Sequence, residues 1–242
     1  MILGQDMAAR NLPLEKIPDE DLPGDEKFRE KRLEMVEMQV RRRGISSSGV
    51  LAAMREVPRH EFVPLEDREM AYADKPLPIG NGQTISQPLI VAVMASALEL
   101  TGIERVLDVG TGSGYNTAIL SHLAQDVFSI EWHTKLAEEA QERLKSLGYE
   151  NVHVIAADGA EGWPEDSLFD AISVAAAVPA IPPPLLEQLK EGGRLVIPVG
   201  SIDTQELLQV IRYPGGDVQQ ALCPCRFVPL IGRYGFSMAP ER

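Results

Sequence analysis

The sequence has little cysteine, an excess of acidic over basic residues, and no long apolar run. Its 242 residues include 2 cysteines, 23 lysines and arginines, and 36 aspartates and glutamates, which gives a formal net charge of −13 at pH 7. Nucleic-acid binding needs a basic surface, so this balance argues against such a partner. No stretch approaches the roughly 18 uninterrupted apolar residues of a membrane-spanning helix, and residues 1–26 lack the features of a signal peptide. We therefore expect a cytoplasmic protein with no membrane contact.

The few cysteines and histidines also exclude a disulfide framework and a zinc site. Cys223 and Cys225 lie in one predicted strand, and we interpret both as packing residues. The four histidines are scattered at positions 60, 122, 133 and 153. Because structural zinc needs a cluster of such ligands, we predict no metal site.

The most informative segment that is present is an apolar strand running into three glycines. Gly110, Gly112 and Gly114 occupy alternate positions and precede a helix-like segment. Glycine tolerates positive φ and lets a ligand lie against the backbone, so this pattern is typical of a cofactor-binding turn. A dinucleotide-binding turn would place its third glycine at position 115, where this chain has Tyr115. The spacing favours a nucleoside without phosphates, such as S-adenosylmethionine.

Two acidic residues at the ends of later predicted strands favour this interpretation over an ordinary tight turn. Glu131 lies 21 residues after the first glycine of the turn, where an acid in such folds accepts both ribose hydroxyls. Asp158 and Gly159 directly follow another predicted strand, where an acid can accept from an adenine amino group. Open α/β sheets bind ligands at the carboxyl ends of their strands, so these residues should meet at one site.

Alternating strands and helices in the central part of the chain predict an α/β fold. Strands are expected at 105–110, 126–131, 151–156, 169–174 and 194–199, and helices at 115–124, 134–147 and 182–190. This alternation implies parallel βαβ units with right-handed crossovers. Segments 206–212 and 221–228 are predicted to form a final antiparallel pair.

The first hundred residues are predicted to be mainly helical. We expect a loose arm at 1–26, a helix at 28–43 ended by Gly44, a helix at 50–57 capped by Ser47 or Ser48, and a helix at 88–100. Prolines at 58, 64, 76 and 78 predict an irregular connection over 58–88.

Five segments of the chain are distinctive when taken together. They are Val-Pro-Arg-His-Glu-Phe-Val-Pro at 57–64, Leu-Pro-Ile-Gly-Asn-Gly-Gln-Thr-Ile-Ser-Gln-Pro at 77–88, the glycine turn at 106–115, Gly-Gly-Arg-Leu-Val-Ile-Pro-Val-Gly at 192–200 and Arg-Phe-Val-Pro-Leu at 226–230. With these segments the chain resembles the protein-L-isoaspartate O-methyltransferases. Many methyltransferases share the glycine turn, whereas segment 77–88 is far more specific to this family. The resemblance implies a Rossmann-like class I methyltransferase with N-terminal helices and a mostly parallel sheet that ends in an antiparallel pair.

The resemblance also implies an activity and a set of site residues. The family transfers the methyl group of S-adenosylmethionine to the free α-carboxylate of L-isoaspartyl residues in damaged proteins and peptides, which starts repair through a succinimide and leaves S-adenosylhomocysteine. Ser86 matches the active-site serine, with Thr84 and Ile85 lining the cofactor beside it. Glu131 matches the ribose-binding acid, and the pair Asp158-Gly159 matches the adenine-binding residues.

Some of these residues have alternative structural roles. Ser86 could hold the substrate carboxylate with one hydrogen bond, cap the helix that follows, or do both. Asp108 could contact the methionine amino group or make a structural hydrogen bond to the glycine turn. Trp132 could cover the adenine or simply pack, and we interpret Arg59 and His60 as structural.

We expect a monomer with one methyltransferase domain at 27–242. It divides into a helical and substrate-loop region at 27–100, a Rossmann-like core at 101–232 and a tail at 233–242. Two other functions fit less well. A relative that methylates ordinary aspartate in one dedicated peptide would be expected to carry a further C-terminal domain. A non-catalytic S-adenosylmethionine-binding adaptor would be expected to lose segment 77–88, which is intact here.

The first testable prediction concerns the arm. A truncated protein that starts at Asp25 should keep its affinity for S-adenosylmethionine and its methyl transfer, because the composition of residues 1–26 cannot bury much apolar surface. Calorimetry and transfer of labelled methyl groups to an isoaspartyl peptide measure both. A truncated protein that is folded but inactive would place the arm in the site.

Overall fold

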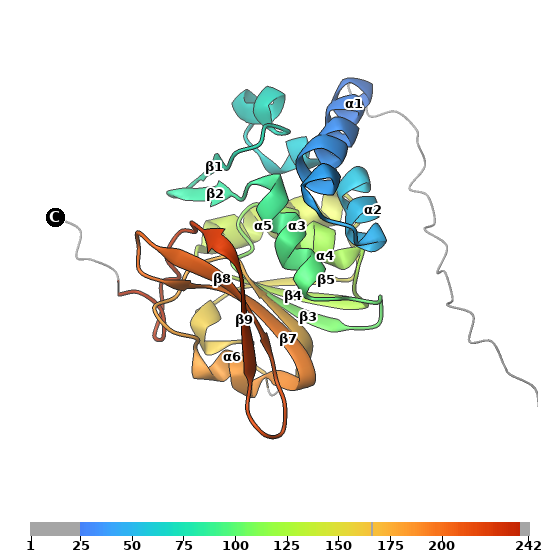
Figure 1. Ribbon diagram of the computed structural model, residues 1–242. Helices are drawn as coiled ribbons and strands as arrows, with labels where there is room; N and C mark the ends of the chain where they lie inside the picture. Colours follow the sequence, from blue (N-terminus) through green and yellow to red (C-terminus); the bar gives the residue numbers. More distant parts are fainter. Residues whose placement is uncertain (1–24, 166, 238–242) are drawn as a thin grey trace, which may run out of the picture.

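The computed structural model of the chain describes residues 25–165 and 167–237 (Figure 1). The predicted arm therefore lies almost wholly outside the described residues, as do residues 238–242 of the predicted tail. Among the described residues, the strands form a seven-stranded sheet and a separate two-stranded hairpin. Figure 1 shows the hairpin and the N-terminal helices gathered above one end of the large sheet.

The order of the large sheet is β5-β4-β3-β6-β7-β8-β9. Its strands are β3 Arg105–Val109, β4 Asp126–Glu131, β5 Val152–Ala156, β6 Phe169–Val174, β7 Leu189–Gly200, β8 Gln205–Ile211 and β9 Val218–Cys225. The first five run parallel, while β8 is antiparallel to both β7 and β9. The predicted class and the final antiparallel pair are confirmed. Strands β4 and β6 lie on opposite sides of β3, so the order of the strands reverses direction at β3. Open α/β sheets have a ligand-binding crevice at such a switch point, and we therefore expect one at the carboxyl end of β3.

Helices connect these strands at the predicted places. They are α3 Pro88–Ala97, α4 Tyr115–Ser121, α5 Thr134–Ser146 and the short α6 Pro183–Glu187. The segment after α6 differs from the prediction, since β7 begins at Leu189 rather than near residue 194. The two glycines inside β7 hid this extension, because Gly192 adopts a φ of +77° and a glycine pair usually marks a turn.

Both faces of the sheet are buried, and each carries its own apolar cluster. Successive residues of a strand point to opposite faces, so Val106 packs with residues of α3 and α4 whereas its neighbour Leu107 packs in the cluster that contains Leu185 of α6. The first cluster also contains Val50 and Met54 from the N-terminal region. That region is therefore joined to the sheet by a common core.

The N-terminal region begins with α1, Asp25–Met35, and continues as a π-helical turn to Val40 and a 3₁₀ turn to Arg43. The predicted helix is present, but it changes hydrogen-bonding pattern after Met35. Gly44 ends it with a φ of +101°, as expected. The second helix, α2 Ser48–Glu56, is capped by Ser47, whose hydroxyl accepts a hydrogen bond from the Val50 N–H at 3.4 Å.

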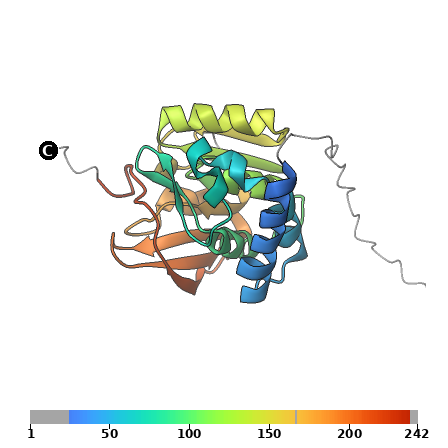
Figure 2. The same ribbon diagram turned by 90° about the horizontal axis from the view of Figure 1, so that it is seen from above.

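The irregular connection predicted over 58–88 is wrong in one part, because it contains a β-hairpin. Strand β1, Leu77–Gly80, pairs antiparallel with β2, Gln83–Ile85. The turn uses positive φ at Gly80, Asn81 and Gly82, which Asn-Gly sequences favour. Pro78 obscured the short strand, since proline is accepted only at sheet edges. Seen from above, this hairpin and the N-terminal helices lie over the sheet (Figure 2).

Two glycines with similar backbone conformations provide a test of packing at the glycine turn. Gly114 and Gly148 have φ of +94° and +83°. A Cβ added to Gly114 would lie 3.1 Å from Leu144 Cδ1, whereas a Cβ added to Gly148 would have no atom within 4 Å. Gly148→Ala should cost about 1–2 kcal/mol of unfolding free energy from backbone strain. Gly114→Ala should cost about 1 kcal/mol more, because Leu144 must move. Urea denaturation measures both losses, and equal losses would contradict this account.

Candidate active site

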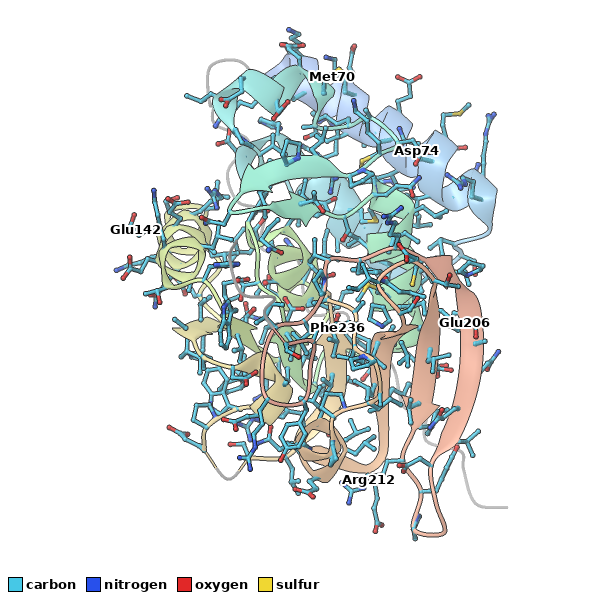
Figure 3. All side chains as sticks on the ribbon, turned by 90° about the vertical axis from the view of Figure 1, so that its left-hand side faces the viewer. Met70, Asp74, Glu142, Glu206, Arg212 and Phe236 are labelled. Carbon is cyan, nitrogen blue, oxygen red and sulfur yellow. The ribbon has the colours of Figure 1, made fainter. Side chains whose placement is uncertain are left out.

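A pocket lies at the carboxyl ends of β3, β4 and β6, under the β1–β2 hairpin. Its lining comes from residues 83–86, Val91 and Met94 of α3, residues 109–113, 115 and 116 around the glycine turn, residues 130–133, Gly159, residues 175–176 and residues 228–231. Figure 3 faces this side of the molecule. In this view the segment around Phe236 crosses the centre of the picture, below the hairpin. Glu142 of α5 lies on one side of it and Glu206 of β8 on the other.

The glycine turn presents bare backbone to the pocket. Gly110 and Gly112 have φ of +94° and +55°, and both line the pocket. A Cβ on Gly112 would lie 3.2 Å from Ile79 Cδ1, so the hairpin packs close to the turn. Gly110 donates its N–H to the Ile130 carbonyl at 2.8 Å, which fixes the turn to β4. Gly114 instead lies away from the lining, where it begins α4.

Glu131 joins the end of β4 to the glycine turn. Its carboxylate is buried and accepts hydrogen bonds from the Gly112 N–H at 2.8 Å and the His133 N–H at 3.0 Å, one on each oxygen. A carboxylate oxygen has two acceptor positions, so each oxygen keeps one for a ligand hydroxyl. Glu131 also lines the pocket, as the ribose hypothesis requires.

The predicted adenine-binding pair is split by the structure. Gly159 lines the pocket, and a Cβ there would lie 2.5 Å from Val109 Cγ1, so only glycine fits. Asp158 is outside the lining. Its carboxylate accepts the Ala160 N–H at 2.9 Å and the Arg233 N–H at 2.8 Å, which ties the C-terminal segment to the end of β5. The adenine contact of Asp158 stays a prediction.

Asp108 also lies behind the pocket wall rather than in it. Its fully buried carboxylate accepts hydrogen bonds from Asn116 Nδ2 at 2.8 Å and Thr117 Oγ1 at 2.7 Å. Burial raises the pKa of Asp108 to about 6, against the opposing effect of these hydrogen bonds. The role of Asp108 in this geometry is structural, but these two hydrogen bonds go to side chains of α4 and not to the glycine turn, and Asn116 rather than Asp108 lines the pocket.

Ser86 lies in the wall formed by the hairpin, together with Thr84 and Ile85. The structure does not support the helix-cap alternative for Ser86. Helix α3 begins at Pro88, its N-cap position is Gln87, and no side chain makes the capping hydrogen bond. Ser86 is therefore a half-buried residue of the pocket wall that makes no capping hydrogen bond to α3.

Arg59 has a role that the sequence did not indicate. Its fully buried guanidinium donates to the Ala71 carbonyl and to the Ser86 carbonyl, both at 2.7 Å, and lies 4.7 Å from the centre of the Tyr115 ring. Burial lowers its pKa. Arg59 is structural, as predicted, but its partner is the backbone of Ser86. His60 is also buried, with Nδ1 2.8 Å from the Tyr72 hydroxyl.

The lining residues Gln83 and His133 had no clear functional signal in the sequence. Gln83 Nε2 lies 3.4 Å from His133 Nε2, so the hairpin meets the loop after β4. Trp132 lines the pocket and is 42% exposed, which leaves its ring free to cover a ligand or to remain in solvent. Among the residues that the structure describes, no cluster of three or more His, Cys, Asp or Glu residues is placed to hold a metal ion.

The sheet order and the pocket at the switch point between β4 and β6 define a Rossmann-like methyltransferase fold. A family model of protein-L-isoaspartate(D-aspartate) O-methyltransferase matches residues 30–235, and the chain belongs to this family. It is 53% identical over 209 residues to protein-L-isoaspartate O-methyltransferase 1 of Syntrophobacter fumaroxidans, covering 86% of this chain and 98% of the relative.

Two solved structures of the family are also similar. A protein-L-isoaspartate O-methyltransferase superposes with a TM-score of 0.76 at 31% identity, covering 86% of this chain and 67% of that one. A Plasmodium falciparum protein of the same description, in complex with S-adenosyl-L-homocysteine, gives a TM-score of 0.72 at 28% identity, covering 83% and 98%. The predicted family and fold are confirmed.

The contacts of Glu131 generate a prediction for ligand binding. Glu131→Gln should weaken S-adenosylhomocysteine binding by about tenfold or more, because hydrogen bonds to a charged acceptor contribute roughly 1.5–3 kcal/mol each. Calorimetry measures the affinity. Glu150→Gln, which removes the same charge from an exposed position before β5, should leave it unchanged. Equal affinities for wild type and Glu131→Gln would reject the ribose assignment.

Proposed function

We propose that this chain transfers the methyl group of S-adenosylmethionine to the free α-carboxylate of L-isoaspartyl residues in damaged proteins and peptides. The observation that supports this best is the meeting of two elements at one pocket. The glycine turn and Glu131 suit a nucleoside, and the segment most specific to the family places Ser86 in the same wall. The adaptor alternative expected that segment to be lost, yet its residues 83–86 line the pocket.

The residues of the pocket fit S-adenosylmethionine. Gly110, Gly112 and Gly159 offer backbone without Cβ atoms, and Glu131 offers acceptors for two hydroxyls. A buried carboxylate at this position would repel a phosphate on the ribose hydroxyls, which favours a ligand with a free ribose. When bound, S-adenosylmethionine supplies an electrophilic methyl group on its sulfonium, and S-adenosylhomocysteine is the product.

The reaction needs orientation more than proton transfer. An α-carboxyl group has a pKa of about 3.3–3.7, so near neutral pH the substrate is already an ionised nucleophile. Ser86 would donate one hydrogen bond to this carboxylate and align an oxygen with the methyl carbon. Apolar lining residues such as Ile85, Met94 and Leu230 would keep water away from the reacting atoms. No general base is required.

Arg59 would support this alignment without touching the substrate. Its guanidinium holds the Ser86 carbonyl from the buried side. The peptide that carries the hydroxyl is therefore fixed against the N-terminal region. Methylation turns the carboxylate into an ester, and attack by the next backbone nitrogen of the substrate releases methanol and forms the succinimide, whose hydrolysis returns some normal aspartate.

We also propose a cytoplasmic monomer that binds no nucleic acid. The net charge of −13 opposes self-association and phosphate binding alike. Cys223 and Cys225 are free and only half-buried, which is usual where thiols stay reduced. No helix in the described part of the chain is long and apolar enough to span a membrane.

Paired peptides test the proposed reaction directly. Labelled S-adenosylmethionine is supplied with two peptides of one sequence that differ only in an aspartyl or an isoaspartyl linkage. We expect label on the isoaspartyl peptide alone. Label on both peptides, or on the aspartyl peptide alone, would overturn the proposed substrate.

Ser86→Ala tests the role of the hydroxyl. Loss of one hydrogen bond to a charged group should lower kcat/KM on the isoaspartyl peptide by about ten- to a hundredfold, with S-adenosylhomocysteine affinity unchanged within a fewfold. Thermal stability should change little, because Ser86 does not cap α3.

Ser47→Ala is the matched control, since Ser47 caps α2 through the Val50 N–H, away from the pocket lining. It should lose about 1 kcal/mol of stability and keep normal kinetics. A Ser86→Ala protein with wild-type kinetics would exclude the orienting role.

A further inference from the structure

Asn116 joins the buried Asp108 to the pocket. It lies in the first turn of α4 and lines the pocket. Its Nδ2 donates to Asp108 Oδ1 at 2.8 Å and to Ser173 Oγ at 3.2 Å. Asp108 and Ser173 are register partners in β3 and β6, so both acceptors lie on one side of the amide. These bonds fix which end of the amide is nitrogen and which is oxygen.

The oxygen of this amide lacks a partner among the described residues. Asn116 Oδ1 is buried and makes no hydrogen bond there. Buried polar atoms are nearly always paired, and an unpaired one in a native protein needs an explanation. Because Asn116 lines the pocket, a bound molecule with an N–H donor would supply the missing bond.

The sheet order places Asn116 on the side of β3 opposite Glu131. Strands β4 and β6 flank β3 on opposite sides. Glu131 ends β4, whereas Asn116 contacts Ser173 of β6. A ligand whose ribose lies at Glu131 must extend across the end of β3 toward β6. In S-adenosylmethionine the part that continues beyond the ribose is the amino-acid group.

We infer that Asn116 Oδ1 accepts a hydrogen bond from the α-ammonium group of the bound cofactor, and that Asp108 and Ser173 orient the amide for it. An amide oxygen only accepts, so it selects the ammonium rather than the carboxylate of the amino-acid group. Asp108 then acts through Asn116 and needs no contact with the ligand. The inference rests on the proposed function, since it assumes that the cofactor binds in this pocket.

The test compares S-adenosylhomocysteine with its deaminated analogue, in which hydrogen replaces the α-amino group. Wild type should bind S-adenosylhomocysteine at least about tenfold more tightly than the analogue, as expected for one hydrogen bond from a charged donor. Asn116→Leu should lose about tenfold or more of its affinity for S-adenosylhomocysteine and bind the analogue within about twofold of wild type. Calorimetry measures all four affinities.

Further variants separate this role from a change in folding. Asn116→Ser keeps a donor for Asp108 but shortens the side chain, and it should show the same selective loss. Glu131→Gln should weaken both ligands equally, because both contain the ribose. Ser121→Ala, in the same helix but outside the pocket lining, should weaken neither.

Each outcome decides between the two claims. Equal weakening of both ligands in the Asn116 variants, or equal binding of both ligands by wild type, would overturn the inference and leave the proposed function standing. Failure of wild type to bind S-adenosylhomocysteine would overturn the proposed function and the inference with it. If neither Asn116 variant folds, the affinity ratio in wild type decides.

Discussion

The hydrogen bond from the Gly112 N–H to the Glu131 carboxylate joins the turn after β3 to the end of β4, and the site is arranged around it. The bond needs β3 and β4 to be parallel neighbours, so that their carboxyl ends meet at one edge. It also needs positive φ at the turn, which glycine adopts without strain. The crossover helix α4 starts directly after its N-cap residue Gly114 and brings Asn116 against β6. One contact therefore links backbone conformation, sheet topology and ligand chemistry.

The N-terminal region complements this sheet by holding the hairpin that carries Ser86. A buried guanidinium is costly unless it is hydrogen-bonded, and Arg59 meets part of this need with the carbonyls of Ala71 and Ser86, while its Nη1 has no hydrogen-bond partner among the described residues. Ile79 approaches Gly112 from the same hairpin. The sheet thus provides one side of the pocket wall, with the glycine turn and Glu131, and the hairpin provides another, with Ser86. A change in the packing of either part would alter the distance between these two sides of the pocket.

Most of the core was predictable because each strand combines an apolar run with a clear boundary. The strand from Asp126 to Glu131 was predicted to the residue. The β1–β2 hairpin was missed, because a strand of four residues that contains Pro78 shows little periodicity. The Gly-Asn-Gly turn was the available signal for it. The π-helical turn after Met35 was also missed, since propensity does not distinguish one helical hydrogen-bonding pattern from another.

The sequence by itself determined the family, the glycine turn and the position of Glu131 at the end of β4, because backbone φ requirements and strand ends depend on local residues. Only the tertiary structure decided which polar groups reach the pocket. It buried Asp108 behind Asn116, turned the Asp158 carboxylate to the Arg233 N–H, and placed Gln87 rather than Ser86 at the start of α3. Burial and hydrogen-bond partners depend on segments that are distant along the chain, and residue spacing carries no information about how those segments pack.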